Sequence, residues 1–257
     1  YAVHRYFEPL PSGFRYAEFN NLQSVKDIMD EYVCAILTEP VQGEGGVRPA
    51  SQEFLQGLRD LCDEKGILLM FDEVQVGSGR TGKLFAHQNY GVEPDTCSMA
   101  KALGSGVPIG AVCARGEAAK TLTPGTHGST FGGNPVVCAG ANVVVDRLDQ
   151  SFLAQVSERA VQLRTSLAKL PHVKNISGIG LMVGIEFFGV AVGAHDGGVH
   201  PGQLGAGSGI LHDHDLSALA SHSAGGVGAG LQYGVQLCIR DLPGLVGAAA
   251  AAAANGL

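Results

Sequence analysis

The chain has 257 residues, of which 45% are hydrophobic and 16% are charged, and its formal net charge at pH 7 is −7. This composition is typical of a soluble globular protein that buries one substantial core, or one core and a small second lobe. The acidic balance and the lack of any run of Lys or Arg argue against nucleic acids or an anionic membrane as partners, which leaves small metabolites as the expected ligands.

The six cysteines are far apart in the sequence and form no C-x-x-C pair, which argues against a disulfide framework or a zinc site. We therefore expect reduced thiols in a reducing compartment. No apolar run approaches the roughly 20 residues that span a membrane. The sequence starts at Tyr1 with neither Met nor the apolar segment of a signal peptide, so we expect it to start inside a longer chain.

Apolar and amphipathic segments alternate between residues 32 and 188, a pattern typical of an α/β fold. Ser51 is placed to cap a helix over 51–65 whose apolar side chains form one stripe, and Gly66 is placed to end it. The order strand, helix, strand favours parallel pairing of the strands on either side of this helix. In chain order, we expect strands at 33–37 and 67–71 around that helix, a strand at 109–114, helices at 136–148 and 151–170, and a strand at 181–188.

The sequence changes in character after residue 188. The segment 189–257 is rich in glycine, contains no lysine and includes a run of alanines at 248–254. Few large apolar side chains are present to offset the entropy of ordering glycine, so we expect much of this segment to be loose. The cluster His212-Asp213-His214-Asp215 has metal-ligating residue types, but a solvated loop is the favoured interpretation because nothing near it fixes the ligands. We expect no metal.

Two charged side chains stand where ligand chemistry is expected. Asp72 follows an apolar strand, and ligands bind at the carboxyl ends of strands in parallel α/β sheets. Residues two apart share one face of an extended segment, so we expect Asp72 and Val74 to face one ligand while Glu73 points away. Lys101 lies between an apolar stretch and a glycine-rich turn, a setting that suits a desolvated, nucleophilic lysine. Taken alone, Asp72 and Lys101 each also have a purely structural interpretation. An Asp at a strand end usually caps a turn, and a single Lys usually lies in solvent.

Five blocks, in this order, carry a resemblance to a known family. They are EPVQGEGGV at 39–47, FDEVQ at 71–75, GRTG at 79–82, AKALG at 100–104 and HGSTFGGNP at 127–135. Together they resemble the class III aminotransferases, which depend on pyridoxal 5′-phosphate (PLP), and within that family the acetylornithine aminotransferase group. The resemblance covers roughly residues 6–188.

The resemblance implies a fold-type I transferase with an α/β large-domain core, in which a mainly parallel sheet has helices on both faces. On this basis we expect a PLP-binding core over 1–148 that lacks its N-terminal part. A partial C-terminal α+β lobe would begin at 149–188, and a degenerate or disordered segment would occupy 189–257.

The resemblance also implies roles for individual residues. Lys101 would bond covalently to the PLP aldehyde and later move a proton between substrate and cofactor. Asp72 would keep the pyridine nitrogen protonated, so that the ring can accept electrons. The other implied positions are Val74 on the ring face, Gln75 at the phenolic oxygen, Thr130 at the phosphate of the neighbouring subunit's cofactor, Ser129 and Glu44 near the substrate, and Arg80 in a supporting loop.

Two features of the family are not matched. The glycine-threonine turn that binds the phosphate, and the aromatic residue on the other ring face, would precede Tyr1, so we expect this chain alone to bind PLP weakly. The family's arginine for the substrate carboxylate has only Arg240 as a counterpart, in a context that matches poorly.

The function that the resemblance implies is transamination of N-acetylornithine with 2-oxoglutarate in arginine biosynthesis, by a homodimer with shared active sites. Ornithine, γ-aminobutyrate and glutamate-1-semialdehyde are alternative substrates. A truncated, non-catalytic homologue that acts only as a partner subunit is the alternative from a different class. The expected compartment is the cytosol of a bacterium, or a plastid or mitochondrion of a plant or alga.

Overall fold

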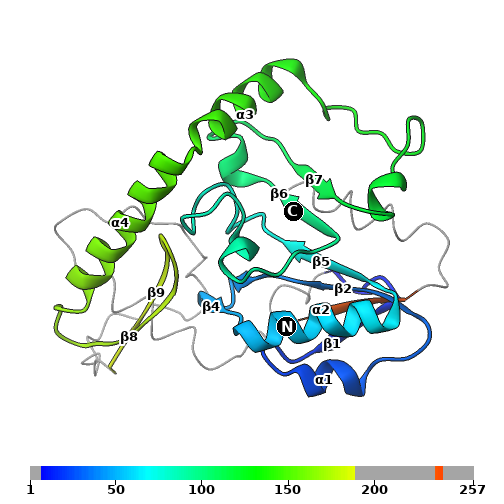
Figure 1. The fold of residues 1–257 in the computed structure, drawn as a ribbon, viewed down its shortest axis with the longest axis horizontal. Helices are drawn as coiled ribbons and strands as arrows, with labels where there is room; N and C mark the ends of the chain where they lie inside the picture. The colour runs from blue at the N-terminus through cyan, green and yellow to red at the C-terminus, as the bar shows by residue number, and fades with distance from the viewer. Residues whose placement is uncertain (1–6, 189–234, 240–257) are drawn as a thin grey trace.

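The structure is a computed structural model that describes residues 7–188 and 235–239 (Figure 1). Three of its helical segments, η1 to η3, are short 3-10 helices. The elements are β1 (Phe14–Ala17), α1 (Leu22–Asp27), β2 (Val33–Thr38), β3 (Val41–Gln42), β4 (Arg48–Pro49), α2 (Gln52–Lys65), β5 (Leu68–Asp72), η1 (Ala86–Asn89), β6 (Thr96–Met99), η2 (Lys101–Leu103), β7 (Ala111–Ala114), η3 (Ala118–Lys120), α3 (Pro135–Arg147), α4 (Gln150–Leu167), β8 (Val173–Ile179), β9 (Met182–Phe187) and β10 (Val235–Ile239).

A six-stranded sheet in the order β1-β10-β2-β5-β6-β7 forms the centre of the fold (Figure 1). Strands β2, β5 and β6 pair in parallel, whereas β10 and β7 run antiparallel to their neighbours. Because β1 and β2 both run antiparallel to β10, the strands β1, β2, β5 and β6 all point in the same direction. The sheet is therefore mixed but mostly parallel, as expected for this α/β fold class, and the parallel pairing on either side of α2 is confirmed.

The helix between these parallel strands begins and ends where the sequence predicts. Ser51 Oγ accepts a hydrogen bond of 3.1 Å from Phe54 N, and Gly66 closes α2 with a left-handed φ of 64°. Its apolar stripe faces the sheet, with Leu55 and Leu58 fully buried. Burying a leucine side chain contributes about 2 kcal/mol, so this stripe is what holds α2 on the sheet.

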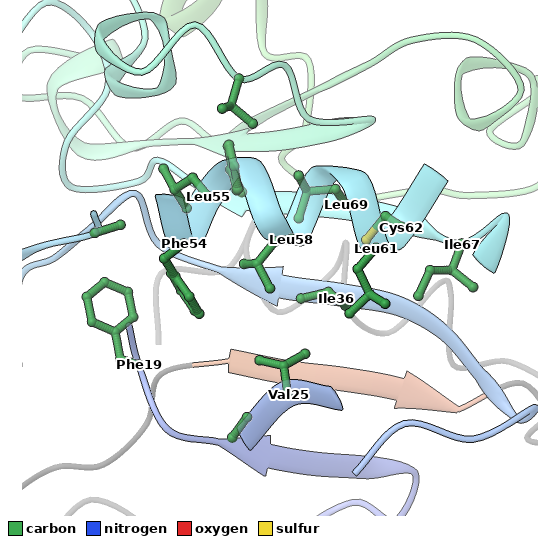
Figure 2. Packing of buried hydrophobic residues seen from close by; sticks show 14 of the residues in the cluster. Phe19, Val25, Ile36, Phe54, Leu55, Leu58, Leu61, Cys62, Ile67 and Leu69 are labelled. Carbon is green, nitrogen blue, oxygen red and sulfur yellow. The ribbon is translucent and has the colours of Figure 1, made fainter. Parts of the chain in front are cut away.

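The main core lies between the sheet and the two helices α1 and α2. Figure 2 shows Leu58 and Leu61 of α2 beside Ile36 of β2, with Val25 of α1 in the same layer. The burial of side chains alternates along β5, as in a strand with one buried face. Leu69 and Phe71 are buried, whereas Leu68, Met70 and Asp72 are half-buried. The two helices thus cover one face of the sheet, and the side chains of β5 that point to the other face are half-buried in the described part of the chain.

Helices α3 and α4 and the hairpin β8–β9 follow the sheet along the chain (Figure 1). Asn134 Oδ1 caps α3 by accepting from Val136 N, and Asp149 Oδ1 caps α4 by accepting from Phe152 N. The hairpin turn is held against the loop after β5, because a Cβ atom added at Gly180 would lie 2.7 Å from Arg80 O. The second part of the structure therefore contacts the loop that follows Asp72.

Several elements differ from the sequence-based expectation. Strands β6 and β8 were not predicted, and β10 comes from within the segment that was expected to be loose. Strand β6 is only four residues long, so its alternation of half-buried Thr96 and Ser98 with buried Cys97 and Met99 is too short to predict a strand from the sequence. The predicted helix at 151–170 and strand at 181–188 correspond to α4 and β9. The division into a core and a second lobe stays a prediction.

Candidate functional site

Three polar side chains form a row at the carboxyl ends of β2, β5 and β6. The register pairs Thr38 with Phe71 across β2 and β5, and Asp72 with Ser98 across β5 and β6. Glu39, one residue beyond Thr38, is therefore next to Asp72 at the end of the neighbouring strand. Because side chains alternate between the two faces of a sheet, the register directs Glu39, Asp72 and Ser98 to the face opposite Phe71 and the α2 core. We call these three residues the polar row.

The Asp72 carboxylate is fixed by two hydrogen bonds that both end on Oδ1. Val74 N donates one at 2.9 Å, and Ser98 Oγ donates the other at 3.2 Å. Within the described ranges, no hydrogen bond or ion pair reaches Oδ2, and Asp72 is half-buried. A carboxylate that is held in place by one oxygen and open at the other suits a cationic N–H donor on a ligand.

The chain turns at Asp72, which corrects the expectation that Val74 continues the strand. Residues 74–81 form turns, and Val74 N folds back onto Asp72. Glu73 points away from the polar row, and it is only 1% exposed. Its carboxylate accepts hydrogen bonds from Ala86 N at 2.5 Å and His87 N at 2.9 Å, and His87 Nδ1 lies 2.7 Å from Glu73 Oε1. Glu73 thereby ties the end of β5 to η1.

Lys101 begins η2 directly after β6, at the same edge of the sheet as Asp72. The residue is exposed, which corrects the expectation of a desolvated lysine, and its backbone has a left-handed φ of 45°. Such a conformation costs a non-glycine residue about 1 kcal/mol or more, and it persists where the surrounding structure fixes it. Leu103 supplies that constraint, since it is 5% exposed and packs with Met99 and Ala141. Hydrophobic contacts therefore hold the turn that presents Lys101.

Gln75 lies against the loop between β3 and β4. A Cβ atom added at Gly43 would be only 1.7 Å from Gln75 Oε1, so no side chain fits at that position unless Gln75 moves. Gly43 N also donates a hydrogen bond of 3.1 Å to Glu39 Oε2. Glu39, Gly43 and Gln75 are thus packed into one region beside Asp72.

Glu39 and Ser98 are the members of the polar row that sequence reasoning missed, and Glu39 is the ionisable one of the two. Burial raises the pKa of Glu39 to about 7; the Gly43 N–H and Lys101 lower this pKa, whereas Asp72 and Glu44 raise it. These electrostatic effects place Asp72 and Lys101 near the same carboxyl group. One signal was available in the sequence, because Glu39 directly follows an apolar strand just as Asp72 does.

The structure does not bring Ser129 and Thr130 to the polar row. They lie in an exposed segment, 121–134, that runs along the outside of the molecule between β7 and α3 (Figure 1). Ser129 Oγ accepts a hydrogen bond of 3.1 Å from Gly132 N, whereas the Thr130 side chain has no hydrogen-bond partner in the described part of the chain. Phe131 beside them is 87% exposed. The roles that the resemblance implies for both residues stay predictions.

The remaining expected site residues are only partly described. Glu44 is exposed in the loop between β3 and β4, and Arg80 is exposed with its carbonyl accepting from Leu181 N at 3.0 Å. Arg240 and the segment 212–215 lie outside the described residues. Over 7–188 and 235–239, no group of His, Cys, Asp and Glu side chains is arranged to hold a metal ion. No helix in these ranges is long and apolar enough to cross a membrane.

Comparisons with known proteins agree on one family. The family profile described as "Aminotransferase class-III" matches residues 9–205. The acetylornithine aminotransferase of Methanocaldococcus jannaschii is 47% identical over 185 residues, which cover 70% of this chain and 46% of that protein. The succinylornithine transaminase of Salmonella enteritidis is 47% identical over 194 residues, which cover 72% of this chain and 48% of that protein. The chain thus spans about half the length of the curated relatives it matches.

Solved structures give the same result. The N-acetylornithine aminotransferase of Stenotrophomonas maltophilia is 39% identical and superposes with a TM-score of 0.61, over 68% of this chain and 47% of that one. The ornithine aminotransferase of Toxoplasma gondii is 38% identical with a TM-score of 0.67, over 73% of this chain and 46% of that one.

Proposed function

Because the chain belongs to the class III aminotransferases, we propose that it binds PLP and transfers an amino group from an ornithine-type donor to a 2-oxo acid. One observation carries this proposal beyond the family match. The half-buried Asp72 carboxylate and the Lys101 amine stand at the ends of neighbouring parallel strands, at the edge of the sheet where α/β folds bind ligands.

The described residues fit PLP by their chemistry. Asp72, held through Oδ1, offers Oδ2 to the ring nitrogen and would keep that nitrogen protonated. Gln75 offers an amide to the phenolic oxygen, and Val74 offers an apolar surface to the ring. When bound, PLP supplies an electron sink for the carbon that carries the amino group. Lys101 would hold the cofactor aldehyde and, once released, take up and return a proton at that carbon.

We propose N-acetylornithine as the amino donor and 2-oxoglutarate as the acceptor, which would place the protein in arginine biosynthesis. The curated relatives at 47% identity are named for acetylornithine and succinylornithine, and both names denote an ornithine with a blocked α-amino group. Ornithine itself is the alternative, since a solved relative is an ornithine aminotransferase. Glu44 and Ser129 are the proposed residues near the substrate, and Arg240 is the proposed partner of its carboxylate.

We also propose a homodimer in which the segment 121–134 of one subunit contributes Thr130 to its neighbour's site. Large apolar side chains on this segment and on α3 are exposed, including Phe131 at 87%, Val136 at 77% and Val143 at 57%. Val136 and Val143 lie seven residues apart on α3 and so share one helix face, and an exposed apolar face of this kind marks an association site in soluble proteins. Sedimentation equilibrium would then give a dimer that Val143→Glu disrupts, whereas Gln155→Glu on the exposed side of α4 leaves it intact.

The proposed activity is tested by supplying PLP and 2-oxoglutarate together with one amino donor at a time and measuring glutamate. We expect N-acetylornithine and N-succinylornithine to be used at least tenfold faster, as kcat/KM, than ornithine or γ-aminobutyrate, a preference worth about 1.4 kcal/mol. A preference for ornithine would overturn the substrate proposal. Because this chain alone is expected to bind PLP weakly, the assay is run up to millimolar PLP. A dimer that neither binds PLP nor forms glutamate at any of these concentrations would overturn the enzyme proposal and leave the non-catalytic partner subunit.

A further inference from the structure

Glu39 and Asp72 are two carboxyl groups at the ends of adjacent parallel strands. Strands β2 and β5 are in register up to Thr38 and Phe71, and neighbouring strands lie about 4.8 Å apart. Both side chains follow the same alternation onto the face of the sheet that carries Ser98. Two carboxylates in so confined a site repel one another, and this repulsion favours a state in which one of them keeps its proton.

The number of accepted hydrogen bonds differs between the two carboxyl groups. Asp72 accepts two hydrogen bonds, from Val74 N and Ser98 Oγ. Glu39 accepts one, from Gly43 N at 3.1 Å, among the described residues. A carboxyl group that accepts fewer hydrogen bonds loses less by keeping its proton, so the proton belongs on Glu39.

The charged groups around Glu39 lead to the same assignment. The pKa of Glu39 is raised to about 7, mainly by burial and also by the negative charges of Asp72 on β5 and Glu44 on the β3–β4 loop. The Gly43 N–H and the positive charge of Lys101 on η2 act in the opposite direction. A positive charge added beside Asp72 and Glu39 would lower the pKa of Glu39. Glu39 then loses its proton, as a carboxyl next to a cation does.

We propose that Glu39 is a positioning residue that holds one proton beside Asp72 and releases it when a cationic aromatic ring binds at Asp72. This inference rests on the proposed function, in which Asp72 faces the ring nitrogen of PLP. In this step the neutral Glu39 carboxyl gives its O–H proton to solvent and becomes a carboxylate. The carboxylates of Glu39 and Asp72 then both face the positive ring. Glu39 acts on the ring only through Asp72 and the local field.

The first measurement is made without PLP. Infrared titration of the protein is expected to show one carboxylic C=O band at about pH 6 that disappears by about pH 8, and that shifts when the glutamates are labelled with ¹³C. The band should be missing in Glu39→Gln and present in Glu53→Gln, which changes an exposed glutamate. A titrating band that survives in Glu39→Gln overturns the inference. If that variant does not fold, absence of a ¹³C-glutamate band from the wild-type protein overturns it.

The second measurement is the pH dependence of PLP affinity. Between about pH 6 and about pH 8, the affinity of the wild type should rise roughly tenfold relative to that of Glu39→Gln, because a new negative charge faces the ring. Parallel pH profiles for the two proteins would contradict the inference. A protein that shows the infrared band but binds no PLP contradicts the proposed function alone, and one that binds PLP without the band contradicts this inference alone.

Discussion

Ser98 Oγ donates a hydrogen bond of 3.2 Å to Asp72 Oδ1, and this contact joins the ends of two adjacent parallel strands, β6 and β5. The same strand β6 leads within three residues to Lys101. A single pair of strands therefore sets the position of a carboxylate and of an amine. The proposed PLP chemistry needs these two groups on either side of one ring.

Asp72→Asn should preserve the fold but remove most of the transamination rate. The asparagine side chain is nearly isosteric with aspartate and can accept the same hydrogen bonds. Because it is neutral, however, it no longer keeps the ring nitrogen of PLP protonated. Losing one charge-assisted hydrogen bond in a water-poor site is worth about 3 to 4 kcal/mol, or roughly 10²- to 10³-fold in rate. The measurement is single-turnover conversion of bound PLP to its amino form, normalised to bound cofactor. A variant within about threefold of the wild type would show that Asp72 only caps the turn.

Glu73→Gln should destabilise the protein, although Glu73 faces away from the polar row. Its two oxygens accept from Ala86 N and His87 N and contact His87 Nδ1, and the side chain is fully buried. Glutamine has one oxygen and one NH₂ group, so at least one of these donors would face another donor. We expect a loss of about 2 to 3 kcal/mol in urea unfolding. Glu64→Gln at an exposed site of α2 is the control, and equal midpoints for both variants would refute the anchoring role.

Glu39→Gln should stabilise the protein at high pH only. The folded-state pKa of Glu39, about 7, is above the usual value of 4.5, so the folded protein binds this proton more tightly than the unfolded chain does. The penalty for ionising Glu39 is therefore absent below about pH 4.5 and complete above about pH 7. Glutamine avoids the penalty and can still accept from Gly43 N. At about pH 8 we expect a gain of about 2 kcal/mol, falling to zero near pH 4. A gain that is independent of pH would contradict the assigned pKa.

The fold could be predicted where periodicity and capping agree. Ser51 and Gly66 fix the two ends of α2, and its apolar stripe indicates the buried face, so the parallel strands around it follow. Strand β10 could not be predicted, because its pairing with β1 and β2 joins residues far apart in the chain, and its flanking sequence is rich in glycine. Local patterns carry no information about such long-range pairing.

The candidate site could be predicted in part. Asp72 and Lys101 were indicated by strand ends and glycine-rich turns, and the register of β5 and β6 brings both to one edge. Glu39 was missed because its proximity to Asp72 depends on the register of β2 and β5, which the sequence does not state. Thr130 lies in an exposed segment, and its expected role depends on a second chain.

In the proposed function, Lys101, just beyond the end of β6, holds PLP beside Asp72. The direct measurement is incubation of the protein with PLP, reduction with borohydride and identification of the modified lysine by mass spectrometry. We predict one PLP per chain on Lys101, lost in Lys101→Ala and retained in Lys120→Ala, which removes an exposed lysine paired with Glu117. Modification that is spread over several lysines, that persists unchanged in Lys101→Ala, or that does not occur at all would contradict it.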